Sequence, residues 1–156
     1  MIVYRISRAN RTALDGKGAT LYPGRWNAEN IPCIYTSETP SLSQLEMMAN
    51  TNNWEMFIAV PHVLLKIEVK DAHVHQILPK DLPPHWADAV FQVSTQDFGA
   101  NLLSDPELLA FSGPSAVTKI ERNIILNPRS HYFETQIKIV EKIPFHFDQR
   151  LLKKYR

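Results

Sequence analysis

Residues 33–50 read CIYTSETPSLSQLEMMAN, and this stretch sets a short strand directly before a helix. Cys33-Ile34-Tyr35-Thr36 has the length and residue types of a strand. Thr39-Pro40 is a favourable helix start, because threonine is a good N-cap and proline is favoured at the first helical position. The helix is expected to run to about Asn50, where the polar cluster Thr51-Asn52-Asn53 ends it. The stretch therefore indicates a fold that combines strands and helices.

On both sides of this stretch, strands outnumber helices. The expected strands are 2–6, 33–36, 57–60, 63–69, 116–117, 123–126 and 135–143, with 72–77 continuing the pairing, and the expected helices are 39–50, 85–93 and 97–103. Residues 15–32 are rich in glycine and proline and are expected to form a loop. The order of elements is irregular. The sequence therefore predicts an α+β fold, a single compact domain over residues 1–156 with mixed or antiparallel strands and two to four helices.

Composition excludes several classes of protein. The chain has 156 residues, of which 44% are hydrophobic, and this favours a globular core over disorder. A net charge of +1 without any block of like charges gives no electrostatic footprint for nucleic acid. The single cysteine, Cys33, fits a reducing compartment, and the longest apolar run is far too short to span a bilayer. We expect a soluble cytoplasmic protein that binds neither nucleic acid nor membrane.

Glu46 is the unusual residue of the predicted helix. Leu42, Leu45 and Ala49 repeat at helical spacing, and Glu46 lies on the same stripe, four residues after Leu42. A carboxylate on an apolar face costs free energy unless a cation or strong donors meet it. Glu46 is therefore either a functional carboxylate or a helix-surface residue whose stripe has been drawn too wide.

Four other residues have ordinary explanations, and three of them also have a functional interpretation. Arg25 is a solvated loop arginine stacked on Trp26, or a clamp for an anion such as phosphate. Tyr35 is a core aromatic or a pocket residue. Ser115, which follows a turn, satisfies local backbone groups or faces a pocket. Asn127, beside a proline, has turn formation as its default explanation.

Metal and thiol chemistry find little support in the sequence. His73 and His75 would share one face of a strand, but no further ligands accompany them, so no metal site is expected. Cys33 is a candidate nucleophile only by its proximity to Tyr35, and burial is the commoner fate of a free cysteine.

Taken together, the segments resemble the RES domain family, which is named after an arginine, a glutamate and a serine. The matching pieces are Tyr4-Arg5, Gly24-Arg25-Trp26-Asn27, Ile34-Tyr35-Thr36-Ser37, Leu45-Glu46, Trp86, Pro114-Ser115-Ala116-Val117, Glu121-x-Asn123, Asn127-Pro128 and Phe147-Asp148-x-Arg150-Leu151. The three naming residues fall on Arg25, Glu46 and Ser115. Pro23 and Gly113 depart from the family pattern, which usually has a glycine and an aliphatic residue there.

The resemblance implies an ADP-ribosyltransferase-like fold and a toxin of a bacterial toxin–antitoxin pair that consumes NAD+. It implies catalytic roles for Glu46, Arg25 and Tyr35. Substrate binding is expected from Arg5, Arg25, Tyr35, Ser115 and Asn127. NAD+ is then a substrate rather than a cofactor, and inorganic phosphate is a candidate co-substrate. The implied partner is an Xre-type antitoxin that plugs the pocket.

Two classes of function follow from this resemblance. The first is an enzyme that cleaves the nicotinamide–ribose bond of NAD+ by hydrolysis or phosphorolysis, or that transfers ADP-ribose to a protein. The second is a catalytically silent module that binds NAD+ or a partner. Retention of Arg25, Tyr35 and Glu46 together favours the enzyme, because a silent module has no need of the carboxylate. Exposed strand edges also make a homodimer a candidate assembly.

Overall fold

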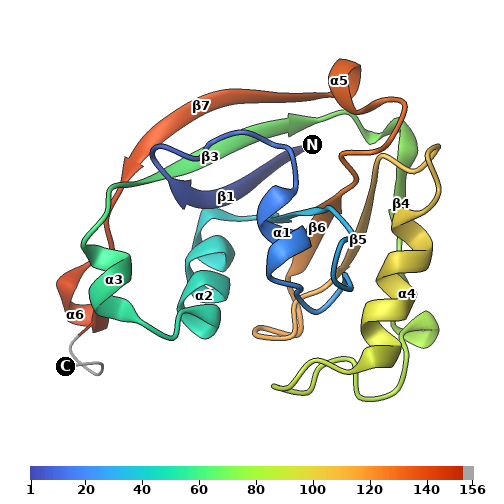
Figure 1. The fold of residues 1–156 in the computed structure, drawn as a ribbon, viewed down its shortest axis with the longest axis horizontal. Coiled ribbons are helices and arrows are strands. Elements are labelled where there is room, and N and C mark those ends of the chain that lie inside the picture. Colours follow the sequence, from blue (N-terminus) through green and yellow to red (C-terminus); the bar gives the residue numbers. More distant parts are fainter. Residues whose placement is uncertain (153–156) are drawn as a thin grey trace.

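A single curved sheet of seven strands organises the chain (Figure 1). The computed structural model describes residues 1–152. The strands are β1 (Ile2–Arg8), β2 (Ile34–Ser37), β3 (His62–Val69), β4 (Val74–Gln76), β5 (Ala110–Pro114), β6 (Arg122–Leu126) and β7 (Ile137–Phe145). They lie in the order β4-β5-β6-β2-β1-β3-β7, and every neighbouring pair is antiparallel except β4 and β5. The predicted α+β class with mixed strands is confirmed.

Six helices accompany the sheet within residues 1–152, against the two to four that were predicted. They are α1 (Lys17–Leu21), α2 (Pro40–Asn50), α3 (Trp54–Ile58), α4 (Val93–Leu103), α5 (Phe133–Gln136) and α6 (Gln149–Leu152). Only α2 and α4 reach 11 residues; the other four have four or five residues, too few for a helical period to show in the sequence. None of the helices is long and apolar enough to cross a membrane.

The helix predicted over residues 85–93 is wrong. Residues 85–90 form turns and bends, and His85 takes a left-handed conformation with φ 61°. The following helix is α4, which begins at Val93 rather than near residue 97. The left-handed His85 interrupts the segment and Trp86 stacks on Trp26, so a helical spacing of apolar residues is not sufficient to form a helix here.

Three short strand predictions also need correction. Residues 57–60 include the end of α3, a helix that begins after the N-cap Asn53, whose side chain accepts a hydrogen bond from the Met56 N–H at 3.0 Å. Residues 116–117 form a turn after β5. Residues 74–76 do form a strand, but it pairs in parallel with β5 and does not extend the hairpin of its neighbours in the chain.

The predicted strand-and-helix pair that begins at Cys33 is confirmed as β2 and α2. Thr39 is the N-cap of α2, and its hydroxyl oxygen accepts a hydrogen bond from the Leu42 N–H at 3.0 Å. Because only two residues separate β2 from α2, the helix lies beside the strand, and α2 also contacts β1.

An aromatic cluster around Trp26 holds the loop before β2 against the sheet and α4. The Trp26 ring packs edge-on against Phe111 at 6.0 Å between ring centres and stacks with Trp86 at 6.2 Å. The backbone of Trp26 also meets α4 closely at Gly99, where a β-carbon would lie 2.0 Å from the Trp26 carbonyl oxygen. Only glycine fits at this contact, and the contact fixes the loop that contains Arg25.

Replacing Gly99 by Ala should therefore destabilise the fold, by about 1–3 kcal/mol or more, because two backbone segments must separate to accept the methyl group. Gly18→Ala in α1 is the matched control, since a β-carbon there meets nothing within 4 Å. The control should be neutral or slightly stabilising. Denaturant unfolding measures both variants; equal stability of the two would show that the packing of α4 on Trp26 is not as close as described.

Candidate active site

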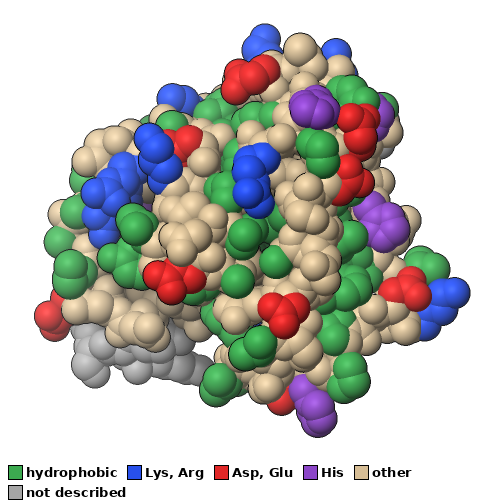
Figure 2. Space-filling view, turned by 45° about the vertical axis from the view of Figure 1, so that its right-hand side comes forward, with side chains coloured by type: hydrophobic (Ala, Val, Ile, Leu, Met, Phe, Trp, Pro, Cys, Tyr) green, Lys and Arg blue, Asp and Glu red, His purple; other side chains and the backbone are tan. Residues whose placement is uncertain are grey.

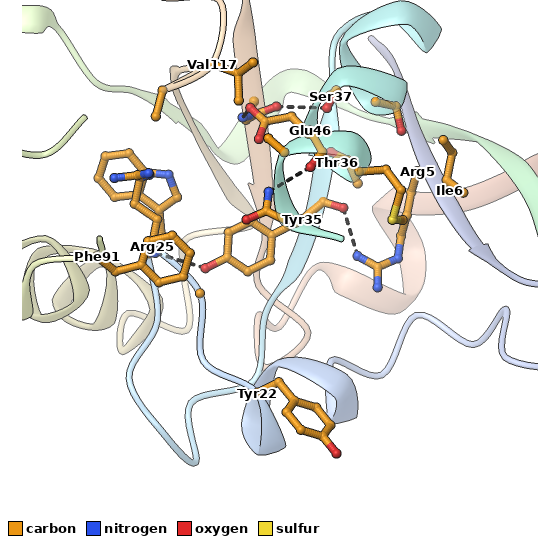
Figure 3. A pocket seen from close by; sticks show the side chains of 18 of the residues that line it. Arg5, Ile6, Tyr22, Arg25, Tyr35, Thr36, Ser37, Glu46, Phe91 and Val117 are labelled. Carbon is orange, nitrogen blue, oxygen red and sulfur yellow. Dashed lines mark hydrogen bonds between the residues drawn. The ribbon is translucent and has the colours of Figure 1, made fainter. Parts of the chain in front are cut away.

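A cavity of about 930 Å³ opens beside β1, β2 and α2. Three loops complete its wall, at residues 22–26, 87–91 and 116–117. In the view of Figure 3, Arg25 and Arg5 lie on opposite sides of Tyr35, and Glu46 projects from α2 near Ser37 and Val117. The cavity therefore brings together charged residues that are far apart in the sequence.

The Glu46 carboxylate is held through one of its two oxygens. Oε1 accepts hydrogen bonds from the Ser115 hydroxyl at 2.7 Å and from the Asn123 side-chain amide at 2.5 Å. Within residues 1–152 no hydrogen bond reaches Oε2, and Glu46 lines the cavity. Two donors to an oxygen stabilise its negative charge. The site therefore presents a fixed carboxylate with one oxygen available to a ligand.

Tyr35 joins the floor of the cavity to the loop that contains Arg25. Its hydroxyl accepts a hydrogen bond from the Trp26 N–H at 2.9 Å and donates one to Asn27 Oδ1 at 2.7 Å. Burial raises the pKa of the Tyr35 hydroxyl well above its ordinary value, so the group remains a donor. A β-carbon at Gly24 would lie 2.6 Å from this hydroxyl, and the glycine of the Gly-Arg-Trp segment is therefore required by close approach.

Arg25 is anchored to the loop on the far side of the cavity. Its Nη1 donates to the carbonyl oxygens of Trp86 at 2.5 Å and Asp88 at 2.8 Å, and the guanidinium lies 5.0 Å from the centre of the Phe91 ring. Burial lowers the pKa of Arg25, and the charge of Glu46 opposes that shift. The guanidinium remains cationic, because arginine does not lose its proton in proteins.

Arg5 supplies a second cation from β1. Its Nη1 donates to the Tyr35 carbonyl oxygen at 2.9 Å, and burial lowers its pKa. Two half-buried guanidinium groups and one carboxylate thus line the same cavity. Such an arrangement suits a ligand that carries both anionic groups and a centre of positive charge.

The family model described as "RES domain" matches residues 2–148 of this chain. The chain belongs to the RES domain family. The protein named "Toxin Res" from Yersinia enterocolitica is 31% identical to it over 153 residues, covering 97% of this chain and 99% of that protein. The "Prs ADP-ribosylating toxin" of Sphingobium sp. is 28% identical over 145 residues, covering 90% and 88% of the two chains.

A solved structure shows that the fold is shared more widely. The crystal structure of the M. tuberculosis MbcT–MbcA toxin–antitoxin complex contains a chain that superposes on this RES domain with a TM-score of 0.68. The match covers 92% of this chain and 83% of that one, at 20% sequence identity.

The RES domain brings four of the predicted site residues to the cavity wall: Arg5, Arg25, Tyr35 and Glu46. Ser115 is fully buried and lies behind Glu46, so in this structure it reaches a ligand only through the carboxylate. Asn127 lies outside the cavity. Its amide donates to the carbonyl oxygens of Asp105 and Leu108 at 3.1 and 3.0 Å, which is a structural use.

The apolar stripe predicted for the helix at residues 39–50 is turned by about one residue from the observed buried face of α2. Leu42 is buried, but Leu45 is 42% exposed and Ala49 is exposed. Ser43 is the other buried residue of α2, and Ser43, Glu46 and Met47 line the cavity. Glu46 therefore faces the cavity, and the donors Ser115 and Asn123 explain how its charge is tolerated on a packed helix.

Two groups that bind Glu46 or orient its partners were not among the predicted site residues. Asn123 begins the apolar run of β6 and donates directly to Glu46, and Ser37 at the end of β2 donates to Asn123 Oδ1 at 2.9 Å. Both residues stand in segments that matched the family, Ile34-Tyr35-Thr36-Ser37 and Glu121-x-Asn123, and this was the sequence signal that could have found them. Phe91, whose ring packs against the Arg25 guanidinium, was also not predicted, because it falls in the segment that was expected to be a helix.

The structure gives no support for thiol or metal chemistry in residues 1–152. Burial raises the pKa of the Cys33 thiol to about 12, so the reactive thiolate is not populated near neutral pH. No group of three histidine, cysteine, aspartate or glutamate residues that could hold a metal ion occurs in this part of the chain. His73 precedes β4 and stacks on Tyr132 with 3.7 Å between ring centres.

The face of the RES domain in Figure 2 shows one small group of lysine and arginine side chains at its left edge, and acidic and hydrophobic side chains elsewhere among scattered basic ones. No broad basic surface covers this face, in agreement with the net charge of +1.

Replacing Tyr35 by Phe should loosen the loop at residues 24–27, because the buried Trp26 N–H loses its acceptor. A loss of about 1–3 kcal/mol in unfolding free energy is expected. Tyr132→Phe is the matched control, since its hydroxyl bonds Glu107 at the exposed surface at 2.6 Å and its loss should cost less than about 0.5 kcal/mol. Urea unfolding compares the two; a Tyr35→Phe protein as stable as the control would contradict the structural role of this hydroxyl.

Proposed function

We propose that this chain is the toxin of a toxin–antitoxin pair and cleaves the bond between nicotinamide and ribose in NAD+. The curated relatives named "Toxin Res" from Yersinia enterocolitica and Photorhabdus laumondii, each matched over nearly its whole length, support the toxin role. The observation that carries the enzymatic part is the cavity-lining Glu46 carboxylate, which is fixed through Oε1 and has no hydrogen bond to Oε2 within residues 1–152.

The chemistry of this bond explains why a fixed carboxylate is useful. As the neutral nicotinamide leaves, positive charge develops on the ribose, and a preorganised negative group lowers the energy of that oxocarbenium-like state. Glu46 Oε2 is the group in question, and it can also accept a hydrogen bond from a ribose hydroxyl. Because Ser115 and Asn123 already hold Oε1, the carboxylate does not need to reorganise during the reaction.

The two arginines would bind the diphosphate of NAD+. Only Nη1 of Arg25 is hydrogen-bonded within residues 1–152, so its Nε and Nη2 remain to donate to phosphate oxygens as a fork. Arg5 likewise uses Nη1 alone. The ring of Tyr35 lines the cavity between them and offers an aromatic face to the cationic nicotinamide ring. The proposal needs no cofactor besides this substrate.

An antitoxin is the proposed partner. The structural neighbour is a toxin solved together with its antitoxin. At the cavity of this chain, Tyr22 is 81% exposed and Val117 is 40% exposed, so apolar side chains stand at its wall without cover. A protein of the Xre type that inserts into the cavity would cover them and exclude NAD+. A homodimer stays a separate proposal.

The acceptor of the ADP-ribose group separates two candidate reactions. Water or inorganic phosphate as acceptor gives an NAD+-depleting enzyme, which is the reaction proposed first. The Sphingobium relative is called an ADP-ribosylating toxin, and that name favours transfer to a protein as the second candidate. A silent binding module would bind NAD+ and release nothing.

Product analysis of the purified chain with NAD+ distinguishes these reactions. We expect free nicotinamide together with ADP-ribose, or with ADP-ribose 1″-phosphate formed faster as inorganic phosphate is added. Chromatography of the products, with and without phosphate, makes the comparison. Radiolabelled ADP-ribose attached to protein would favour the transferase, and binding of NAD+ by calorimetry without nicotinamide release would favour the silent module and contradict the proposal.

A further inference from the structure

We propose that Ser37 is a positioning residue for Glu46 and acts through the side-chain amide of Asn123. This inference rests on the proposed function, because it concerns the carboxylate assigned to the reaction. Ser37 and Asn123 are directly paired residues of β2 and β6, so their side chains lie on the same face of the sheet. Neither residue is among the catalytic and substrate-binding residues predicted from the sequence.

The Ser115 hydroxyl is met by hydrogen-bond donors from its own loop. Its hydroxyl oxygen accepts hydrogen bonds from the N–H groups of Val117 at 3.0 Å and Thr118 at 3.1 Å. A hydroxyl has two acceptor positions and one proton. With both acceptor positions filled, the proton is left for Glu46 Oε1, at 2.7 Å. Ser115 is thus a donor whose direction is set by its own loop.

No comparable loop fixes Asn123, whose amide can in principle rotate by half a turn and exchange its oxygen and nitrogen. A carboxylate oxygen accepts, so Glu46 Oε1 selects the amide nitrogen of Asn123, which lies at 2.5 Å. Ser37 holds the other end of this amide, because its hydroxyl donates to Asn123 Oδ1 at 2.9 Å. Ser37 therefore supports the orientation in which Asn123 donates to Glu46.

Hydrogen bonds next to Ser37 and Asn123 keep the two strands in register at this pair. The Thr39 hydroxyl donates to Glu121 Oε1 at 2.9 Å, and the Arg122 N–H donates to Glu38 Oε1 at 2.6 Å. Both contacts join the segment between β2 and α2 to the start of β6. Ser37 itself is 4% exposed, so solvent does not compete for its hydroxyl.

Replacing Ser37 by Ala should lower kcat about tenfold, while KM for NAD+ changes less than about twofold, because the carboxylate loses its orientation but the arginines keep the diphosphate. Ser112→Ala is the matched control. Ser112 is a buried serine of β5, paired with Ile124 of β6, and its hydroxyl accepts from Arg122 Nε at 2.7 Å outside the cavity wall. Its kcat should stay within about twofold of the original chain.

A second pair of variants shows whether Ser37 acts through Glu46. In a chain that already carries Glu46→Gln, adding Ser37→Ala should change kcat little further, because the group that it positions is gone. Asn123→Asp, which sets an oxygen against Glu46 at nearly constant shape, should lower kcat at least as much as Ser37→Ala. Equal kcat for Ser37→Ala and Ser112→Ala would overturn the inference.

The crystal structure of the Ser37→Ala protein supplies a readout that does not depend on turnover. We expect the Asn123 amide rotated, or Glu46 displaced from Ser115, relative to the unsubstituted chain. Asn123 and Glu46 in unchanged positions would overturn the positioning role. If the original chain released no nicotinamide, the proposed function would fail by itself. The positions of Asn123 and Glu46 in the Ser37→Ala crystal structure would still test whether Ser37 positions Glu46.

Discussion

One carboxylate oxygen, Oε1 of Glu46, joins three elements that the sequence keeps apart. It comes from α2 and accepts hydrogen bonds from Ser115, after β5, and from Asn123 at the start of β6. A charged group on a packed helix is costly to desolvate, and two donors at 2.7 and 2.5 Å offset much of that cost. Both bonds use the same oxygen, so within residues 1–152 the second oxygen of this cavity-lining residue has no hydrogen bond. The two donors therefore offset the cost of the charge and also leave one carboxylate oxygen for a ligand.

A second hydrogen-bonded centre, at the Tyr35 hydroxyl, sets the opposite wall. It holds Trp26 and Asn27, and the buried Asn27 amide in turn donates to the carbonyl oxygens of Ala19, Ala28 and Ile31. Arg25 lies between Gly24 and Trp26, so the position of its guanidinium follows from this centre and from Trp86. The cavity is thus shaped by buried polar contacts rather than by apolar packing alone, and such contacts specify one arrangement of the loop.

The sequence was sufficient for the elements whose signals are local. The Thr39-Pro40 start of α2, the alternating strands β1 and β3, and the coincidence of Arg5, Arg25, Tyr35 and Glu46 in a single cavity follow from caps, periodicity and a family resemblance. Asn123 and Ser37 stand in segments that matched the family, but their roles could not be assigned from the sequence, because these roles depend on the register of β2 against β6. The segment at 85–92 was misjudged for a related reason: the left-handed His85 and the contacts of Trp86 with Trp26 outweigh a helical spacing of apolar residues. Asn127 is an ordinary structural asparagine, and its side chain shows this only once the loop that it supports is seen.

The most direct test of the account is the turnover of NAD+ by Glu46→Gln, measured as nicotinamide release beside the original chain. Glu55→Gln is the matched control, an exposed helical glutamate of α3 outside the cavity wall. If the carboxylate stabilises the charge that develops on the ribose, Glu46→Gln should lose on the order of a hundredfold or more in kcat, with a smaller change in KM and a stable fold. Glu55→Gln should keep its rate. A Glu46→Gln protein that releases nicotinamide at the original rate would contradict the central claim that this carboxylate is the catalytic group.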